Sequence, residues 1–166
     1  MSHAIRALCA WLERTPFSRE LQTREWAMPA VQTVHLLALA TVMGAALLLN
    51  LRLLGVRMAD VPLPRVLSRF VPVILGSLLI LLLSGVLMIF AEPERALLNP
   101  VFGLKMALLA GVLALTAATI APLRRSPAFW DTGKARPRLL RASALLSTGL
   151  WVAVLFAGRW IAYARS

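Results

Sequence analysis

The chain has 166 residues, of which 60% are hydrophobic, and its mean hydropathy is +0.78. Soluble domains are about 45–50% apolar, so this composition excludes an ordinary water-soluble domain and indicates an integral membrane protein. The formal net charge of +11 would also suit nucleic acid, but ten of the 18 basic residues fall in two loops between apolar segments. We therefore expect the lipid bilayer, and no nucleic acid, as the partner of these loops.

Residues 1–27 are predicted to form an N-terminal interfacial helical segment. The charged residues of this segment lie at other positions. The apolar residues that recur at helical spacing are Ile5, Leu8, Trp11 and Leu12. That pattern is typical of a short amphipathic helix lying on a membrane surface. The pair Thr15 and Pro16 should end this helix, because proline disfavours the helical conformation in the residue before it.

Residues 28–166 are predicted to form a domain of four transmembrane helices. Its four apolar stretches approach or exceed the roughly 17–25 residues that span a bilayer, and they cover about 29–51, 71–90, 101–122 and 142–163. They are continuous and lack the alternation of barrel strands. The second stretch should open after Pro72, since proline is tolerated near a helix start. The predicted fold is all-α, an integral membrane four-helix bundle preceded by the short interfacial helix.

The loops between the predicted spans differ in charge. The first and third loops, 52–69 and 124–141, carry ten basic residues together, whereas the second carries one. Cytoplasmic loops of membrane proteins are enriched in lysine and arginine. The two basic loops are therefore predicted to be cytoplasmic, with both termini on the opposite side.

Four polar side chains are predicted to share one side of the bundle. His35 lies about six residues inside the outer end of the first span, or roughly 9 Å deep, and Ser84 lies at the same depth in the antiparallel second span. Lys105 and Arg159 lie about four residues inside the same ends of spans three and four. Three further side chains are candidates for the same pocket: Gln32, Trp151 and Met88.

A b-type haem would use such residues. Imidazole is a common axial ligand of haem iron, helical bundles hold the macrocycle, and propionates need cations. His35 would then bind the iron, with Lys105 and Arg159 on the propionates and Met88 as a second ligand, or with five-coordinate iron. A quinone is the alternative cofactor, with His35 and Ser84 on its carbonyls. A third reading is structural, because a histidine in a span can simply hydrogen-bond a neighbouring helix.

Other chemistry has less support. No Asp or Glu lies inside a predicted span, which argues against a proton-coupled transporter. The single cysteine, Cys9, excludes an intramolecular disulfide and a CxxC metal or redox pair.

Three stretches resemble a family of small, uncharacterised bacterial inner-membrane proteins with four spans: WAMPAVQTVHLLALATVMGAALLLNLRLLG, LNPVFGLKMALLA and FAGRWIAY. The resemblance runs from about Trp26 to Tyr163 and implies the bacterial inner membrane. With the orientation expected from the loop charges, both termini would be periplasmic. More distantly, His35 followed by Gly44 and Arg52, together with FGLKMALL, is similar to the small membrane protoporphyrinogen oxidases. Those proteins associate with haem b, so this resemblance implies haem binding at His35 and Lys105.

Two functional hypotheses follow. The first is a membrane protein whose periplasm-side pocket binds haem b or a quinone and passes electrons to a redox partner. The alternative is a non-catalytic accessory or scaffold subunit, acting as a homo-oligomer or within a membrane complex. The sequence assigns neither a substrate nor a reaction.

Overall fold

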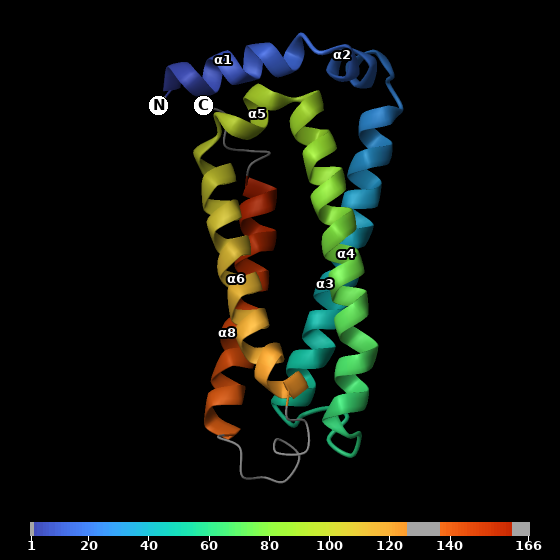
Figure 1. Ribbon diagram of the computed structural model, residues 1–166, viewed down its shortest axis with the longest axis vertical. Helices are drawn as coiled ribbons and strands as arrows, with labels where there is room; N and C mark the ends of the chain where they lie inside the picture. Colours follow the sequence, from blue (N-terminus) through green and yellow to red (C-terminus); the bar gives the residue numbers. More distant parts are fainter. Residues whose placement is uncertain (1, 126–136, 161–166) are drawn as a thin grey trace.

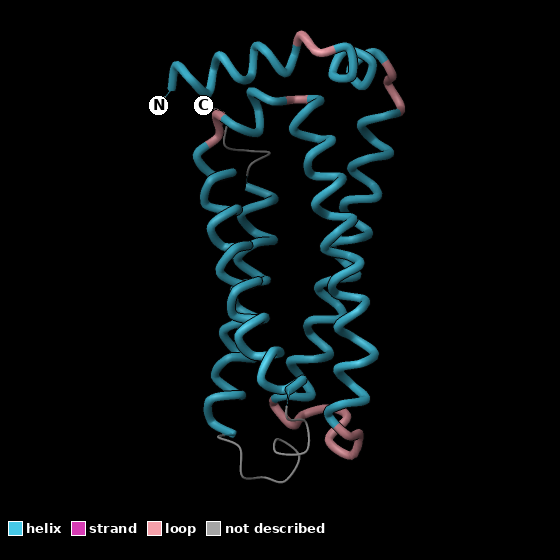
Figure 2. Tube along the Cα trace, viewed as in Figure 1, coloured by secondary structure: helices cyan, strands magenta, loops and turns pink. Residues whose placement is uncertain are grey.

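The computed structural model describes residues 2–125 and 137–160 of the chain. Figure 2 shows helices joined by short loops, and these described residues contain no strand. Seven helices are described: α1 (Ser2–Glu13), α2 (Pro16–Thr23), α3 (Ala27–Leu53), α4 (Leu63–Ala91), α5 (Pro93–Leu97), α6 (Pro100–Arg125) and α8 (Pro137–Trp160). The predicted all-α fold is confirmed.

Four of these helices, α3, α4, α6 and α8, are long and apolar enough to cross a membrane. Large apolar side chains remain exposed on the outside of the bundle, among them Leu36, Leu82, Leu146 and Phe156. Water disfavours so much contiguous apolar surface, whereas lipid accepts it. The arrangement is therefore that of an integral membrane bundle.

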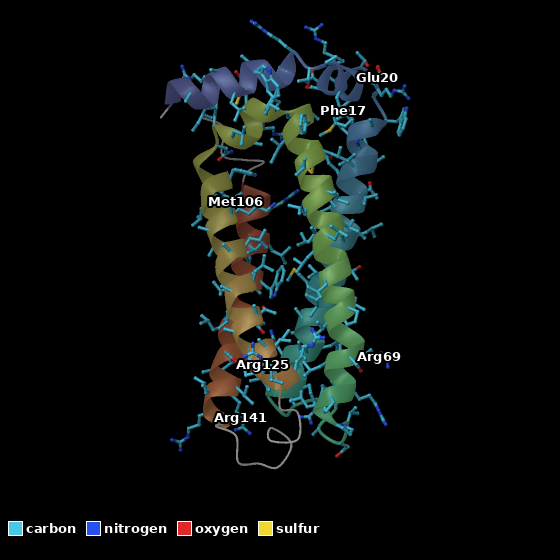
Figure 3. The ribbon with its side chains drawn as sticks, in the orientation of Figure 1. Phe17, Glu20, Arg69, Met106, Arg125 and Arg141 are labelled. Atoms are coloured by element: carbon cyan, nitrogen blue, oxygen red, sulfur yellow. The ribbon has the colours of Figure 1, made fainter. Side chains whose placement is uncertain are left out.

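The long helices form two antiparallel hairpins. Helix α3 packs along α4, α6 packs along α8, and α3 also contacts α8, which joins the hairpins (Figure 1). We call the end that carries α1, α2 and α5 the capped end. The opposite end, where Figure 3 shows Arg69, Arg125 and Arg141, is the basic end. The described basic residues that begin and end the two basic loops of the sequence therefore share one end of the bundle.

The second long helix begins earlier than the sequence predicted. Helix α4 starts at Leu63 and runs through Pro72, whereas a helix opening after Pro72 was expected. Pro64 stands in the first turn, where the missing amide hydrogen costs nothing. The first two turns also carry Arg65 and Arg69, so they extend beyond the apolar segment that guided the prediction.

The last predicted span also differs in its limits. Helix α8 begins at Pro137, five residues before the expected 142, and residues 161–163 of the predicted span lie outside the described part of the chain.

Helices α1 and α2 lie across the capped end (Figure 1). The joint between them is where Thr15 and Pro16 predicted it: Thr15 caps α2 and accepts a hydrogen bond from the Ser18 amide. The Ser18 hydroxyl donates to the Phe90 carbonyl at 2.7 Å, and Gln22 Nε2 donates to the Ala91 carbonyl at 3.0 Å. Carbonyls in the last turn of a helix have no partner within it. Helix α2 therefore caps α4.

The thiol of Cys9 gives a test of how α1 docks. Cys9 is completely buried, and burial raises the pKa of its thiol, helped by the carboxylates of Glu94 and Glu13. Because the thiolate is the reactive form, we expect maleimide labelling of the folded protein to be slow and to accelerate only at a higher pH than for a free cysteine. Fast labelling in detergent, equal to that after denaturation, would show that α1 is not docked.

Candidate cofactor-binding site

The centre of the candidate site is a contact between two neighbouring helices. His35 lies on α3, about 12 Å from its start at the helical rise, and Ser84 lies on α4 near its capped end. The Nδ1 atom of His35 and the Oγ atom of Ser84 are 2.8 Å apart. The imidazole also packs over Gly85, since its Cε1 atom would lie 3.8 Å from a Cβ added there.

The other contacts of Ser84 indicate which nitrogen of the imidazole carries the proton. The Ser84 hydroxyl donates to the Ile80 carbonyl at 2.7 Å, one turn earlier in α4. A hydroxyl has a single proton, so when Ser84 gives it to Ile80, its oxygen accepts a hydrogen bond from Nδ1 of His35. His35 is then the Nδ1–H tautomer, and Nε2 keeps its lone pair. Nε2 has no hydrogen bond within the described residues.

Lys105 is the cation of the candidate site. It lies in the second turn of α6, is half-buried, and its ammonium packs against Gly158 of α8, 3.7 Å from where a Cβ atom would be. No ion pair of Lys105 is found among the described residues, and the four spans contain no carboxylate. The ammonium is therefore available to an anionic group.

The remaining predicted residues are placed less closely. Gln32 and Arg159 are exposed, near the capped ends of α3 and α8. Met88 is half-buried on α4, one turn from Ser84, and its role as a thioether ligand stays a prediction. Trp151 is only 3% exposed, two turns below Gly158 on α8. Its indole nitrogen is the one side-chain polar atom among the described residues that is fully shielded and has no hydrogen-bond partner.

The indole of Trp151 gives a test of stability. An unpaired buried donor costs about 1–3 kcal/mol, so Trp151→Phe removes this cost while it also removes packed atoms. We expect the free energy of unfolding, measured by thermal unfolding in detergent, to change by no more than about 1 kcal/mol in Trp151→Phe. In Trp151→Ala it should fall by about 3–5 kcal/mol. Equal losses in both variants would mean that the indole N–H has a partner.

A second polar contact, which was not predicted from the sequence, lies at the other end of the bundle. Asn50 of α3 is 6% exposed and donates through Nδ2 to Ser147 Oγ at 3.3 Å and to Thr148 Oγ1 at 3.0 Å, both on α8. An asparagine within an apolar run is itself the signal that could have revealed it, because a buried amide needs partners. The contact joins the two hairpins.

The described side chains can hold a metal only in a limited way. No group of three or more His, Cys, Asp or Glu residues gathers within the described ranges. A site built wholly from protein ligands, as for structural zinc, needs about four such ligands. A metal that brings most of its own ligands, as haem iron does, needs one or two from the protein.

The fold and the site define a class: an integral membrane protein of four candidate spanning helices, with a histidine and an unpaired lysine in the capped half. Residues 26–164 match a family of unknown function, DUF6644. The chain belongs to this family, which agrees with the resemblance to uncharacterised four-span proteins. No curated protein and no solved structure matches the chain.

Proposed function

We propose that the protein binds haem b in the capped half of the bundle and takes part in electron transfer. One observation carries the proposal: the Nδ1 atom of His35 is held by Ser84, whose own proton is committed to the Ile80 carbonyl. Histidines that bind metals through Nε2 usually donate their other N–H in this way, which orients the ring and raises its basicity. In this tautomer, His35 would offer Nε2 to the iron with Nδ1 supported by Ser84.

Lys105 supports the same proposal from the other hairpin. A propionate carboxylate would supply the anion that the described residues do not offer this ammonium. Arg159, at the same end of α8, is the second proposed propionate contact. When bound, the haem iron supplies one-electron redox chemistry. The protein's part is to bind and orient the group, through His35 on α3 and Lys105 on α6.

The hydrogen bonds favour haem over a quinone. A quinone carbonyl is an acceptor, so it needs donors from the protein. In the Nδ1–H tautomer, Nε2 of His35 is itself an acceptor, and the Ser84 proton is directed to a backbone carbonyl. Of the three central side chains, His35, Ser84 and Lys105, only Lys105 could then donate to a quinone. Quinone binding is accordingly the second choice.

We also propose the bacterial inner membrane as the location, with the basic end in the cytoplasm and the capped end in the periplasm. The charge difference between the loops supports this orientation. Val56, in the loop after α3, is 66% exposed. In a Cys9→Ser background, a Val56→Cys variant should react with a membrane-impermeant maleimide only after the cells are opened. Labelling of intact spheroplasts would show that the basic end faces the periplasm, and the proposed orientation would be wrong.

The visible spectrum of the purified protein tests haem binding. Protein expressed with iron and a haem precursor, and purified in detergent, should show a Soret band and an alpha band that appears on reduction. Protein purified without haem should recover both bands when haem is titrated, with saturation near one haem per chain. A preparation that stays colourless under both conditions would exclude the proposal.

The alternative is a non-catalytic accessory or scaffold subunit, and the same hydrogen bonds favour it in a different way. The His35–Ser84 contact joins α3 to α4, and the Asn50 contacts join α3 to α8. Polar contacts between spans can stabilise packing by about 0.6 kcal/mol each. Under this alternative the protein is colourless, and His35→Ala changes only its stability.

A further inference from the structure

A small cavity lies where the two hairpins meet, toward the basic end. Its volume is about 20 Å³, and all four long helices contribute to its wall. A cavity of roughly 10–15 Å³ or more is large enough for one water molecule. The polar side chains of its wall are Asn50, Thr116, Thr119, Ser143 and Ser147, and the rest of the wall is apolar.

Three of the wall hydroxyls donate their hydrogen bond to a backbone carbonyl of their own helix. Thr116 donates to the Val112 carbonyl at 2.7 Å, Thr119 to the Leu115 carbonyl at 2.8 Å, and Ser143 to the Leu140 carbonyl at 2.9 Å. Each of these hydroxyls therefore retains only acceptor capacity. A group that binds beside them must bring hydrogen-bond donors.

The other two polar residues leave one donor and one acceptor unused. The side-chain amide of Asn50 donates to Ser147 and Thr148, and within the described chain its Oδ1 atom accepts nothing. Ser147 accepts from Asn50, but its own proton has no acceptor there. Both residues are only 6% exposed. Polar groups inside a native fold nearly always have a partner, so a partner for these two groups is expected in the cavity that they line.

We propose that this cavity binds one ordered water molecule that bridges the hairpins. The water accepts the Ser147 proton and donates to Asn50 Oδ1 and to a threonine hydroxyl of α6. Three hydrogen bonds are the usual number for a buried water. This site is separate from the proposed haem site and does not depend on it.

Charge favours water over a monovalent cation of similar size. A buried cation needs an anionic partner or a full oxygen shell, and the four spans contain no Asp or Glu. Arg52 follows Asn50 by two residues and Arg141 precedes Ser143 by two, so the nearby charge is positive. A neutral occupant with two donors fits both the charge and the unused groups.

The bridge joins α3 of one hairpin to α6 and α8 of the other. It therefore also fixes the position of one hairpin along the long axis of the other. His35 and Lys105 belong to different hairpins. The water bridge would therefore help to keep these two side chains at the same level, although it lies at the opposite end of the bundle.

Proton-detected solid-state NMR in lipid bilayers tests the water directly. The chain has two asparagines, Asn50 and Asn99, so asparagine-specific ¹⁵N labelling gives two side-chain amide signals. A gadolinium chelate in the buffer quenches magnetisation from bulk water. We expect transfer from a bound water to the Asn50 amide to persist with the chelate present, and to be lost in Ala46→Val, which fills the cavity.

Ser147→Ala is the milder second variant, since it removes the donor to the water and adds no volume. We expect it to weaken the transfer at Asn50 and to leave the Asn99 signal unchanged. Absence of transfer in the wild-type protein would show a dry cavity and overturn the proposal. So would undiminished transfer in both variants, or a signal that requires sodium and disappears when choline chloride replaces sodium chloride.

Discussion

The His35→Ala variant is expected to lose the Soret band that haem gives with the wild-type protein. The chain has two histidines, and the other, His3, belongs to the N-terminal helix α1. No second imidazole therefore stands within the four spans to replace the ligand. Spectra at equal concentrations of haem and protein, before and after reduction, measure the loss.

Three comparisons separate loss of the ligand from loss of the fold. His3→Ala should keep the full spectrum, and external imidazole should restore a Soret band to His35→Ala by entering the vacated space. Ser84→Ala should lower haem affinity by about 10-fold to 100-fold, as is usual when the partner of a ligating histidine is removed. A His35→Ala protein with an unchanged spectrum would exclude His35 as the ligand.

The level of His35 and Ser84 within the bundle could be read from the sequence. Antiparallel spans place residues that are equally far from a shared end at equal depth, and this counting put the two side chains together. The structure joins them by a hydrogen bond of 2.8 Å. Their role in cofactor binding stays a prediction, because a contact between helices does not by itself require a ligand.

Which way each side chain faces could not be read in the same manner. Helix α3 is apolar on nearly all sides, so its sequence does not reveal which stripe meets the protein and which meets lipid. Asn50 was therefore not predicted as a contact residue, although it faces α8. Gln32 is exposed, and its place in the pocket stays a prediction. The direction in which a side chain points is decided by how the helices pack against one another. That packing depends on residues throughout the chain.

The start of α4 shows a related limit. The apolar run of the second span begins near Pro72, but the helix begins at Leu63, where the chain leaves the loop. Hydropathy reports the part of a helix that lies in lipid, whereas backbone hydrogen bonds continue into the interface. The prolines near residue 63 are compatible with a first turn, so they marked the start of the helix rather than a loop.

Lys105→Met should change stability and ligand binding in opposite directions. In the absence of a ligand, the wild-type ammonium is half-buried without an ion pair among the described residues, and a lysine at the centre of a span costs about 2.5–3.5 kcal/mol. Lys105 lies nearer a helix end, so we expect its replacement to stabilise the haem-free protein by on the order of 1 kcal/mol.

Haem affinity should fall in the same variant, because a charge-assisted hydrogen bond to a propionate is lost. Such bonds contribute about 1.5–3 kcal/mol, which corresponds to roughly a 10-fold to 100-fold weaker affinity. Haem titration and thermal unfolding of the same preparation measure both effects. Arg69→Met, which removes an exposed cation at the basic end of the bundle, is the control. If the Lys105→Met variant is less stable and binds haem normally, Lys105 is a packing residue. If it is more stable and binds haem more weakly, Lys105 lowers stability in order to bind the ligand, as functional side chains often do.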